Sequence, residues 1–372
     1  MSYERLGVGI VGLQPGRSWA ARAHVPALRW LSDTFDIIGV ANTSLESAKA
    51  AADATGLPRA FSDVAELVAA HEVDIVTVAV KVPPHLDIVR TAIAAGKHVY
   101  CEWPLGRTLA EAEEMAALAA QRGILAVVGT QARVAPEVEY LRQLIADGFV
   151  GEVLSTTIVG RGGALQGGST IPDAKTFGYL LDRANGAHLL TIPLGHTLAA
   201  LTSVLGDVAE VSAVLATRRK SALVADTGQI LPVSAPDQVL VSGLMESGAP
   251  LSIHYRGGSA RDSNGFLWEI NGTQGDLRLS GPSGHTQMVP LSLSGARNDE
   301  KEFRTLPVPA SYRSGWPDEP EAGNVARLYA RMASDLRDGG HTAPRFDDAV
   351  RIHRIIAAIE EAAESGRRTR PK

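Results

Sequence analysis

The chain has 372 residues, of which 45% are hydrophobic and 21% are charged. A single core rarely grows beyond about 250 residues, so the length predicts two domains, and the apolar content excludes a largely disordered chain. Lysine and arginine total 36 against 41 aspartates and glutamates, which gives a net charge of −5. This balance lacks the basic excess of a phosphate-tracking surface, so we expect no nucleic-acid partner.

Several features bear on the cellular compartment. Cys101 is the single cysteine, so an internal disulfide cannot form, and the first twelve residues show no charged-then-apolar leader. The apolar stretch Ala187–Leu205 is interrupted by His188, Pro193 and His196. We interpret it as a buried amphipathic helix rather than a membrane span. Together these features predict a cytoplasmic protein without membrane contact.

Residues 6–130 alternate short apolar runs with alanine-rich stretches, which is typical of parallel strands joined by helical crossovers. Nearly continuous apolar runs predict strands buried on both faces. These strands are Val8–Val11, Ile37–Ala41, Ile75–Val80, Val99–Cys101 and Leu125–Val128. Apolar residues at three- and four-residue spacing predict the intervening helices, Glu46–Thr55, Val64–His71, Leu86–Ala95 and Leu109–Arg122. Residues 1–133 therefore predict an open α/β domain.

After Arg133 the pattern changes to short strands separated by turn residues. The predicted strands are Val153–Val159, Val208–Thr217, Gln238–Met245, Leu251–Arg256, Leu267–Asn271 and Leu277–Ser280. Helices are predicted at Pro136–Asp147 and Ala187–Leu205, a long connection at 282–324, and closing helices at Asn324–Gly339 and Phe346–Ser365. Residues 134–372 therefore predict an α+β domain with a large, mostly antiparallel open sheet, closed by helices within 324–366.

The loop after the first predicted strand is a candidate coenzyme site. Glycines follow the strand at a point where backbone N–H groups and a helix N-terminus can bind a pyrophosphate. The motif departs from G-x-G-x-x-G, because Gln14 occupies a glycine position, and a simple strand-to-helix turn is the alternative. The candidate coenzyme-binding residues of this loop are Gly12, Gln14, Gly16, Arg17, Ser18 and Trp19.

The end of the second predicted strand bears on the choice of coenzyme. NAD-selective folds place an acidic residue here, which holds the ribose 2′-hydroxyl and repels a 2′-phosphate. This chain has the neutral residues Asn42, Thr43 and Ser44. We therefore expect NADP to be preferred over NAD. No arginine that would bind the phosphate follows, so a solvated turn is the other interpretation.

Three runs of sequence carry a resemblance to a known protein family: residues 74–85, 94–105 and 148–152. With them, and with the turn at 272–276, the chain resembles the Gfo/Idh/MocA family of dehydrogenases over most of its length. The resemblance implies an N-terminal Rossmann domain, a C-terminal α/β domain whose open sheet forms a homo-oligomer, and NAD(P)-linked chemistry on sugars or polyols. We add to the expected coenzyme-binding residues Lys81, His85, Glu102, Trp103 and Gln131.

The departures from the family pattern concern catalysis. The family's Glu-Lys-Pro signature reads Glu102-Trp103-Pro104 here, so a tryptophan stands at the position of the catalytic lysine. The family's later Asp-x-x-x-His pair aligns with Ile192 and His196, which keeps the histidine and loses the acid. These departures resemble the branch of the family that contains the galactose-regulon repressor of yeasts, a non-catalytic NAD(P)-binding regulator with protein partners. The resemblance thus implies two functions of different classes.

Oxidation of a hydroxyl requires a group that takes its proton and stabilises the developing alkoxide. Trp103 offers only a neutral indole N–H donor, so it cannot replace a lysine in that role. We expect a rerouted mechanism in which His196 carries the proton and Lys81 supplies the cation. Trp103, Arg133, His188 and His196 are the candidate substrate contacts.

Structural interpretations of the same residues stay open. His196 is otherwise a hydrogen-bonded core histidine, Lys81 a salt-bridging or phosphate-binding cation, Trp103 a packing residue and Arg133 a surface arginine. The histidines lack metal-ligand spacing beside cysteines or paired carboxylates, so we expect no metal. No G-x-S-x-G elbow occurs, which argues against a nucleophilic hydrolase. The primary hypothesis is a sugar or polyol oxidoreductase, and the alternative is a coenzyme-binding regulator.

Overall fold

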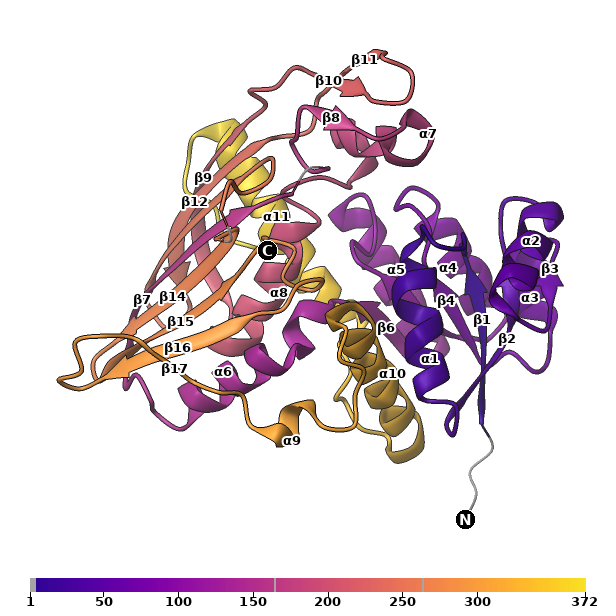
Figure 1. Ribbon diagram of the computed structural model, residues 1–372, viewed down its shortest axis with the longest axis horizontal. Helices are drawn as coiled ribbons and strands as arrows, with labels where there is room; N and C mark the ends of the chain where they lie inside the picture. The colour runs from indigo at the N-terminus through magenta and orange to yellow at the C-terminus, as the bar shows by residue number, and fades with distance from the viewer. Residues whose placement is uncertain (1–4, 164, 263) are drawn as a thin grey trace. The chain divides into compact units, whose positions relative to one another are not determined.

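The structure is a computed structural model that describes residues 5–163, 165–262 and 264–372 (Figure 1). The chain divides into two compact units. Unit 1 lies within Met1–Gln131 and Gly315–Val350, and unit 2 within Ala132–Ser314 and Arg351–Lys372. The expected closing helix around residue 330 belongs to unit 1, so the N-terminal domain is completed by a segment that is remote in sequence.

Unit 1 contains a six-stranded parallel sheet in the order β3-β2-β1-β4-β5-β6, the order of a Rossmann fold. This confirms the predicted fold class. The strands are β1 Leu6–Val11, β2 Phe35–Ala41, β3 Ala60–Phe61, β4 Ile75–Val78, β5 His98–Glu102 and β6 Ala126–Gly129. The helices are α1 Val25–Trp30, α2 Leu45–Thr55, α3 Val64–Ala69, α4 His85–Ala94, α5 Leu109–Arg122 and α10 Pro320–Asp338, with a π-helical turn, η1, at Ala20–His24.

Local sequence accounts for these elements. The central strands are apolar because helices cover both sides of the sheet; Val8, Ile10 and Val78 have no exposed surface. Helices α2 and α5 end at Gly56 and Gly123, both in the left-handed conformation at φ +63°, as the glycine positions predict. Strand β4 ends two residues earlier than expected, which leaves residues 79 and 80 in the following loop.

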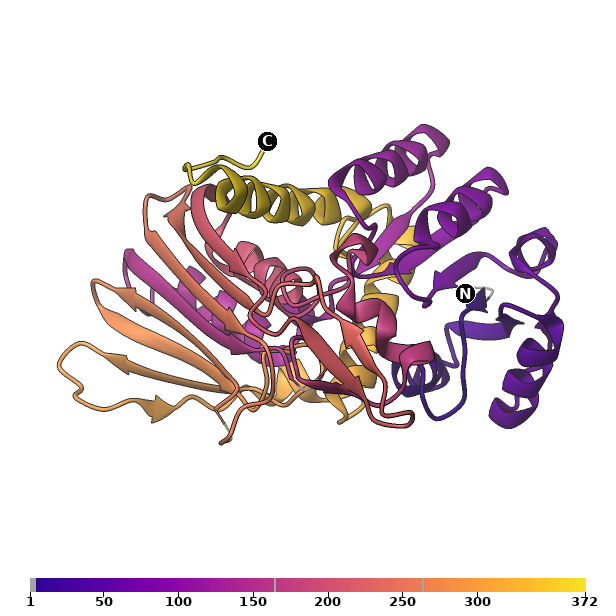
Figure 2. The same cartoon turned by 90° about the horizontal axis from the view of Figure 1, so that it is seen from above.

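Unit 2 contains an eight-stranded mixed sheet in the order β17-β16-β15-β14-β7-β13-β12-β9, antiparallel except for the β13–β7 pair. Helices α6, α8 and α11 lie along one face of this sheet (Figures 1 and 2). The strands are β7 Val153–Arg161, β9 Val208–Ala216, β12 Gln238–Met245, β13 Pro250–Arg256, β14 Phe266–Gly272, β15 Gly275–Gly281, β16 Ser292–Arg297 and β17 Arg304–Thr305. The helices are α6 Pro136–Ala146, α8 Pro193–Leu205 and α11 Phe346–Ser365, whose first turns belong to unit 1.

A second, three-stranded sheet combines one strand from the segment between α6 and α8 with two strands that follow β9, and it packs on its own small core. Strands β8 Thr170–Ile171, β10 Ser221–Val224 and β11 Ile230–Pro232 form it in the order β11-β10-β8. A short helix, α7 Ala174–Phe177, follows β8. The buried residues of the small core are Ile171, Leu181, Ala222 and Val224. The sequence did not predict this sheet, because strands of two to four residues carry almost no alternation.

Two further expectations about the chain after residue 133 were wrong. The connection expected at 282–324 contains β16, β17 and the short helix α9 Ala310–Arg313, and α10 begins within it at Pro320. Helix α8 begins at Pro193 rather than Ala187, because proline lacks an N–H and is suited to the first helical turn. Most of α8 is buried, as predicted, and none of the described helices has the length and apolar character needed to cross a bilayer.

Candidate functional site

The turn after β1 brings backbone atoms to the carboxyl edge of the Rossmann sheet. Gly12 is left-handed, with φ +96°, and its N–H donates to the Ala41 carbonyl at 3.0 Å. A Cβ at Gly12 would lie 2.4 Å from Cγ1 of Val80, so only glycine fits this position without displacing β4 and its following loop. The turn therefore lies at the reversal of strand order between β1 and β4, where such folds bind ligands.

Asn42 holds this turn from the end of β2. Its Oδ1 accepts a hydrogen bond from Leu13 N at 2.9 Å, and its Nδ2 donates to the Leu13 carbonyl at 2.9 Å and to the Ser47 carbonyl at 3.1 Å. Both amide hydrogens are thereby used within the protein. Ser44 caps α2 by accepting from Ser47 N, and Thr43 is exposed.

The remaining loop residues that we predicted to bind the coenzyme lie at the surface or partly covered. Gln14, Gly16 and Arg17 are exposed, and Gly16 is left-handed with φ +69°. The Ser18 hydroxyl accepts from Gln14 N at 2.9 Å and donates to the Gln14 carbonyl at 3.1 Å, which closes the loop ahead of η1. Trp19 is half-buried at the start of that helical segment.

The loops after β4 and β5 are joined by His85. Its ring is buried, with Nδ1 3.1 Å from the Leu105 carbonyl and Nε2 3.2 Å from the Val80 carbonyl. Burial lowers the pKa of His85 below its usual value. Lys81, in the loop after β4, is exposed. His85 therefore links the two loops at the carboxyl edge of the sheet from a buried position, whereas Lys81 is accessible to solvent.

Glu102 ends β5 and is the centre of a buried polar network. Its Oε1 accepts from His24 Nε2 at 2.8 Å, and both of its carboxylate oxygens lie 2.8 Å from Gln131 Nε2. His24 Nδ1 contacts the hydroxyl of Tyr329 at 2.8 Å, and that hydroxyl contacts Thr77 Oγ1 at 2.7 Å. The network joins η1, β4, β5, the turn after β6 and α10, all within unit 1.

Sequence reasoning predicted Glu102 and Gln131 but missed His24, Tyr329 and Thr77. The signal for His24 is its place on the apolar face of a helical stretch, at three- and four-residue spacing from buried Ala20 and Ala27. Tyr329 gives no such signal, because it follows His24 by 305 residues.

Trp103 follows Glu102 directly. Its side chain is almost fully buried, with 5% exposed, and the peptide bond to Pro104 is cis. At this position, which we expected to correspond to the family's lysine, the indole brings neither a charge nor a proton acceptor to this edge of the sheet.

The remaining predicted site residues belong to unit 2. Arg133 is half-buried in the turn before α6. His188 and His196 are buried, and Nδ1 of each has no hydrogen-bond partner among the described residues. Burial lowers the pKa of both histidines to about 3, with a smaller contribution from Arg183 at His188 and from His285 at His196. Both rings are neutral at pH 7, and each retains an unused nitrogen.

A polar group around His285 in unit 2 was not predicted. His285 Nε2 lies 2.8 Å from the Gly162 carbonyl and 2.9 Å from Gln166 Oε1. Nearby, the Tyr255 hydroxyl bonds Thr197 Oγ1 at 2.6 Å and donates to the Gly284 carbonyl at 3.2 Å. His285 falls in the segment that we interpreted as a connection, so its position in the fold was hidden.

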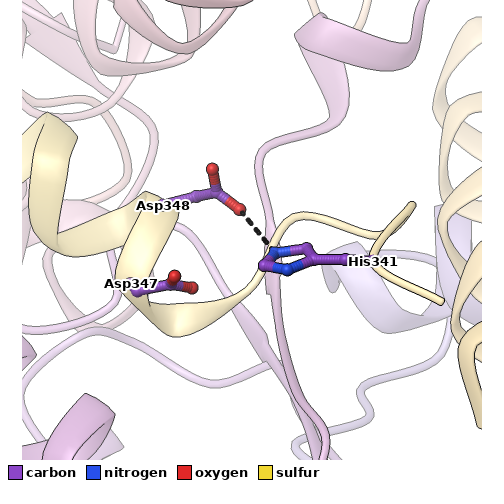
Figure 3. Close-up of side chains that lie close together, drawn as sticks. All are labelled: His341, Asp347 and Asp348. Carbon is purple, nitrogen blue, oxygen red and sulfur yellow. Dashed lines mark ion pairs between the residues drawn. The ribbon is translucent and has the colours of Figure 1, made fainter. Parts of the chain in front are cut away.

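One group of side chains has the proximity of metal ligands. His341, Asp347 and Asp348 each offer one atom, and these atoms lie within 4.8 Å of one another (Figure 3). Asp348 Oδ2 accepts from Arg345 N at 2.9 Å at the start of α11 and lies 3.9 Å from His341 Nε2. His341 and Asp347 are exposed. Helix capping and an exposed ion pair account for this arrangement, and we assign no metal to it.

Comparisons with known proteins agree with the two-unit division. The family model described as "Oxidoreductase family, NAD-binding Rossmann fold" matches residues 6–130, and the one described as "Gal80p, C-terminal domain" matches residues 136–281. The galactose/lactose metabolism regulatory protein GAL80 of Saccharomyces cerevisiae is 27% identical over 96% of this chain and 93% of its own. Dehydrogenase aclE of Aspergillus oryzae is 29% identical over 98% of both chains. Levoglucosan dehydrogenase of Pseudarthrobacter phenanthrenivorans is 25% identical over 97% of this chain and 96% of its own.

Solved structures give the same result. The transcriptional regulator Gal80p of Kluyveromyces lactis has a TM-score of 0.86 at 26% identity, covering 100% of this chain and 95% of that one. Levoglucosan dehydrogenase in complex with NADH and levoglucosan has a TM-score of 0.82 at 22% identity, covering 99% and 100%. The second likeness is one of fold alone. These comparisons confirm the predicted two-domain fold.

Proposed function

We propose that the chain is an NAD(P)-dependent dehydrogenase, because residues 6–130 match the NAD-binding Rossmann model of an oxidoreductase family and residues 136–281 match the Gal80p C-terminal model. Its substrate is a sugar, a polyol or a related small polar molecule, oxidised by hydride transfer. The single observation that carries this proposal is the coenzyme edge of unit 1, where Gly12 leaves no room for a Cβ beside Val80. Relatives that span nearly the whole chain include a sugar dehydrogenase.

The coenzyme would be held by the residues that gather at this edge. We place the pyrophosphate on the loop that follows Gly12, where Gly16 has no side chain and Gln14 and Arg17 are exposed. The N–H groups of Gly12, Leu13 and Gln14 are bonded within the protein and hold the shape of this loop. Ser18 closes the loop. Glu102 and Trp103 come from the end of β5, beside the strand after which Lys81 lies. The bound coenzyme supplies the hydride acceptor.

The proposed preference is for NADP. The residue directly after β2 is the neutral Asn42 rather than an acid that would repel a 2′-phosphate. Thr43 is exposed one residue before Ser44, the N-cap of α2, and its hydroxyl can donate to the phosphate; Glu46 is the one acidic residue in the first turn of that helix. Asn42 contributes by fixing the turn, since both of its amide hydrogens are already bonded. Calorimetric titration with each coenzyme tests this preference, and clearly tighter binding of NAD contradicts it.

The proton route is proposed through unit 2. His196 is neutral, and its unused Nδ1 can accept a hydrogen bond from a substrate hydroxyl. A pKa of about 3 makes this ring a weak base at pH 7, so proton transfer is the slow part of the route. Lys81 supplies the cation that stabilises the alkoxide, while Arg133 and His188 orient the substrate.

The test is turnover with a panel of sugars and polyols, followed by absorbance of the reduced coenzyme. Sustained reduction of NADP or NAD supports the dehydrogenase. Loss of this turnover in His196→Ala supports the assigned proton route, whereas unchanged turnover removes His196 from it. A matched control is His353→Ala, which removes another buried histidine of unit 2.

A second candidate function is favoured by Trp103 at the lysine position: a coenzyme-binding regulator that acts through a protein partner without turnover. A regulatory relative covers nearly the whole chain. Losing a preorganised transition-state donor costs about 3–4 kcal/mol, or roughly a hundred- to a thousandfold in rate. Tight coenzyme binding with no reduction by any substrate favours the regulator.

We also propose that the open face of the large sheet joins copies of this chain. Val214 and Leu240 are directly paired on β9 and β12, and they are 59% and 42% exposed. The row continues across β13 and β7 through His254 and Val159. Exposed apolar neighbours of this kind mark interfaces. Light scattering tests the assembly, and a monomer at micromolar concentration contradicts it; Leu240→Lys should dissociate an oligomer.

A further inference from the structure

We propose that His24 and Tyr329 are positioning residues that hold the Glu102 carboxylate ready to bind a hydroxyl of the nicotinamide coenzyme. This inference rests on the proposed coenzyme binding and assigns residues to it that the sequence did not single out. Its basis is the buried chain of contacts from Thr77 through Tyr329 and His24 to Glu102, with each link between 2.7 and 2.8 Å.

The donors and acceptors of this chain fit a single direction. A carboxylate only accepts, so His24 Nε2–H donates to Glu102, and in this tautomer Nδ1 accepts from the Tyr329 hydroxyl. Tyr329 then accepts from Thr77. Replacing Tyr329 by phenylalanine removes the donor that fixes this tautomer, and with it the orientation of the His24 N–H. The aromatic ring would still pack against Tyr100, whose ring centroid is 4.8 Å away.

Glu102 is held but not saturated. Its two oxygens have about four lone-pair sites. One hydrogen bond from His24 and two contacts from Gln131 occupy three of them, and the fourth, on Oε2, has no donor among the described residues. Glu102 also ends β5 at the carboxyl edge of the parallel sheet, where ligands bind in this fold. An oriented acceptor with one open site suits a hydroxyl donor.

Gly129 gives independent support. A Cβ there would lie 2.7 Å from Glu102 Oε1 and 2.8 Å from Gln131 Nε2. The backbone of β6 thus leaves only enough space for this carboxylate–amide pair. A methyl group at residue 129 displaces the carboxylate while leaving every hydrogen-bonding group of the network present, which no deletion within the network does.

Tyr329 lies on α10, far along the chain from the other members of the network. Tyr329 belongs to the segment that rejoins unit 1 after the whole of the large sheet has been traversed in sequence. Its ring is fully buried, and burial raises the pKa of its hydroxyl, so the group stays protonated. A residue outside the N-terminal Rossmann segment therefore sets the position of a carboxylate at the coenzyme edge.

A double-mutant cycle on the full-length protein tests this assignment, with NADH as the probe and fluorescence titration as the readout. We expect His24→Leu and Glu102→Gln each to weaken NADH binding about tenfold, the size of one charge-assisted hydrogen bond. The double variant should be no weaker than either single variant, because His24 acts only through Glu102. His24→Gln restores a donor and an acceptor and should bind within about threefold of wild type.

Further variants keep the test decisive. If His24→Leu does not fold, Tyr329→Phe and Gly129→Ala replace it in the cycle, and thermal melting is recorded for each. Multiplying effects, roughly a hundredfold in the double variant, would show that His24 acts independently of Glu102 and overturn the inference. Unchanged NADH affinity in folded single variants overturns it as well. Failure of the wild type to bind either coenzyme instead overturns the proposed function, and this inference with it.

Discussion

Acidification should destabilise unit 2 through its buried histidines. His188, His196 and His353 are buried in this unit, and burial lowers the pKa of each from 6.5 to about 3. In the unfolded chain these rings titrate near 6.5, so between pH 6.5 and pH 3 the unfolded state binds more protons than the folded state. Stability therefore rises with pH across this window and is lost as the pH falls through it.

The magnitude follows from the width of the window. At pH 5, about 1.5 pH units separate the solution from the unfolded pKa of 6.5, and each unit is worth about 1.36 kcal/mol. One buried histidine therefore costs about 2 kcal/mol at pH 5 and almost nothing at pH 7.5. Three such residues approach the whole stability of an ordinary domain, which is about 5–15 kcal/mol.

Urea unfolding at pH 7.5 and pH 5.0 measures this effect. His196→Gln removes one titrating ring, so its free energy of unfolding should fall by about 2 kcal/mol less than that of wild type between the two pH values. His71→Gln is the matched control, because its side chain is 92% exposed, and it should follow wild type. Equal losses in His196→Gln and wild type would refute the argument that burial keeps this ring neutral.

Three other predictions concern the coenzyme edge. Gly12→Ala should weaken NADH binding at least tenfold and lower the free energy of unfolding by about 1–3 kcal/mol, because of its positive φ and the contact with Val80; titration and urea unfolding measure both. Asn42→Asp should weaken NADP binding more than NAD binding, because both coenzymes lose the turn held through the Leu13 and Ser47 carbonyls while the new carboxylate repels only the 2′-phosphate. Thr43→Ala should affect NADP alone. Trp103→Lys should raise turnover with an accepted substrate about a hundred- to a thousandfold by absorbance assay, and Trp103→Phe should not; equal rates would contradict the assignment of this position.

The parallel sheet of unit 1 could be predicted because its signals are local. Near-continuous apolar runs mark strands buried on both faces, and Gly56 and Gly123 mark helix ends. Strand β16 was missed, since its inward residues, Leu293 and Gly295, alternate with serine and alanine in a segment rich in turn formers. The apolar pattern there is too weak to separate a strand from a loop.

Some residues of the candidate site could likewise be identified from the sequence, and others could not. Glu102 and Trp103 were singled out by the resemblance of Glu102-Trp103-Pro104 to the family's Glu-Lys-Pro signature, and their place after a predicted strand puts them at one edge of a parallel sheet. Their partner His24 could not be assigned, because its role depends on Tyr329, which is brought to unit 1 by long-range packing. Sequence reasoning places residues along an element, whereas a buried hydrogen-bond network depends on how distant elements pack.

The two candidate functions differ in what the chain has retained. Coenzyme binding and proton transfer depend on different residues, so one can be lost without the other. In unit 1 the Gly12 turn has a positive φ that glycine adopts readily, and His24 and Gln131 hold the buried Glu102 carboxylate at the coenzyme edge. The proton-handling position, by contrast, holds the neutral Trp103, and His196 is a weak base. A dehydrogenase built this way should bind coenzyme as tightly as its relatives and turn over slowly. A regulator should show the same binding with no turnover, so the affinity places the chain in neither class and the rate decides between them.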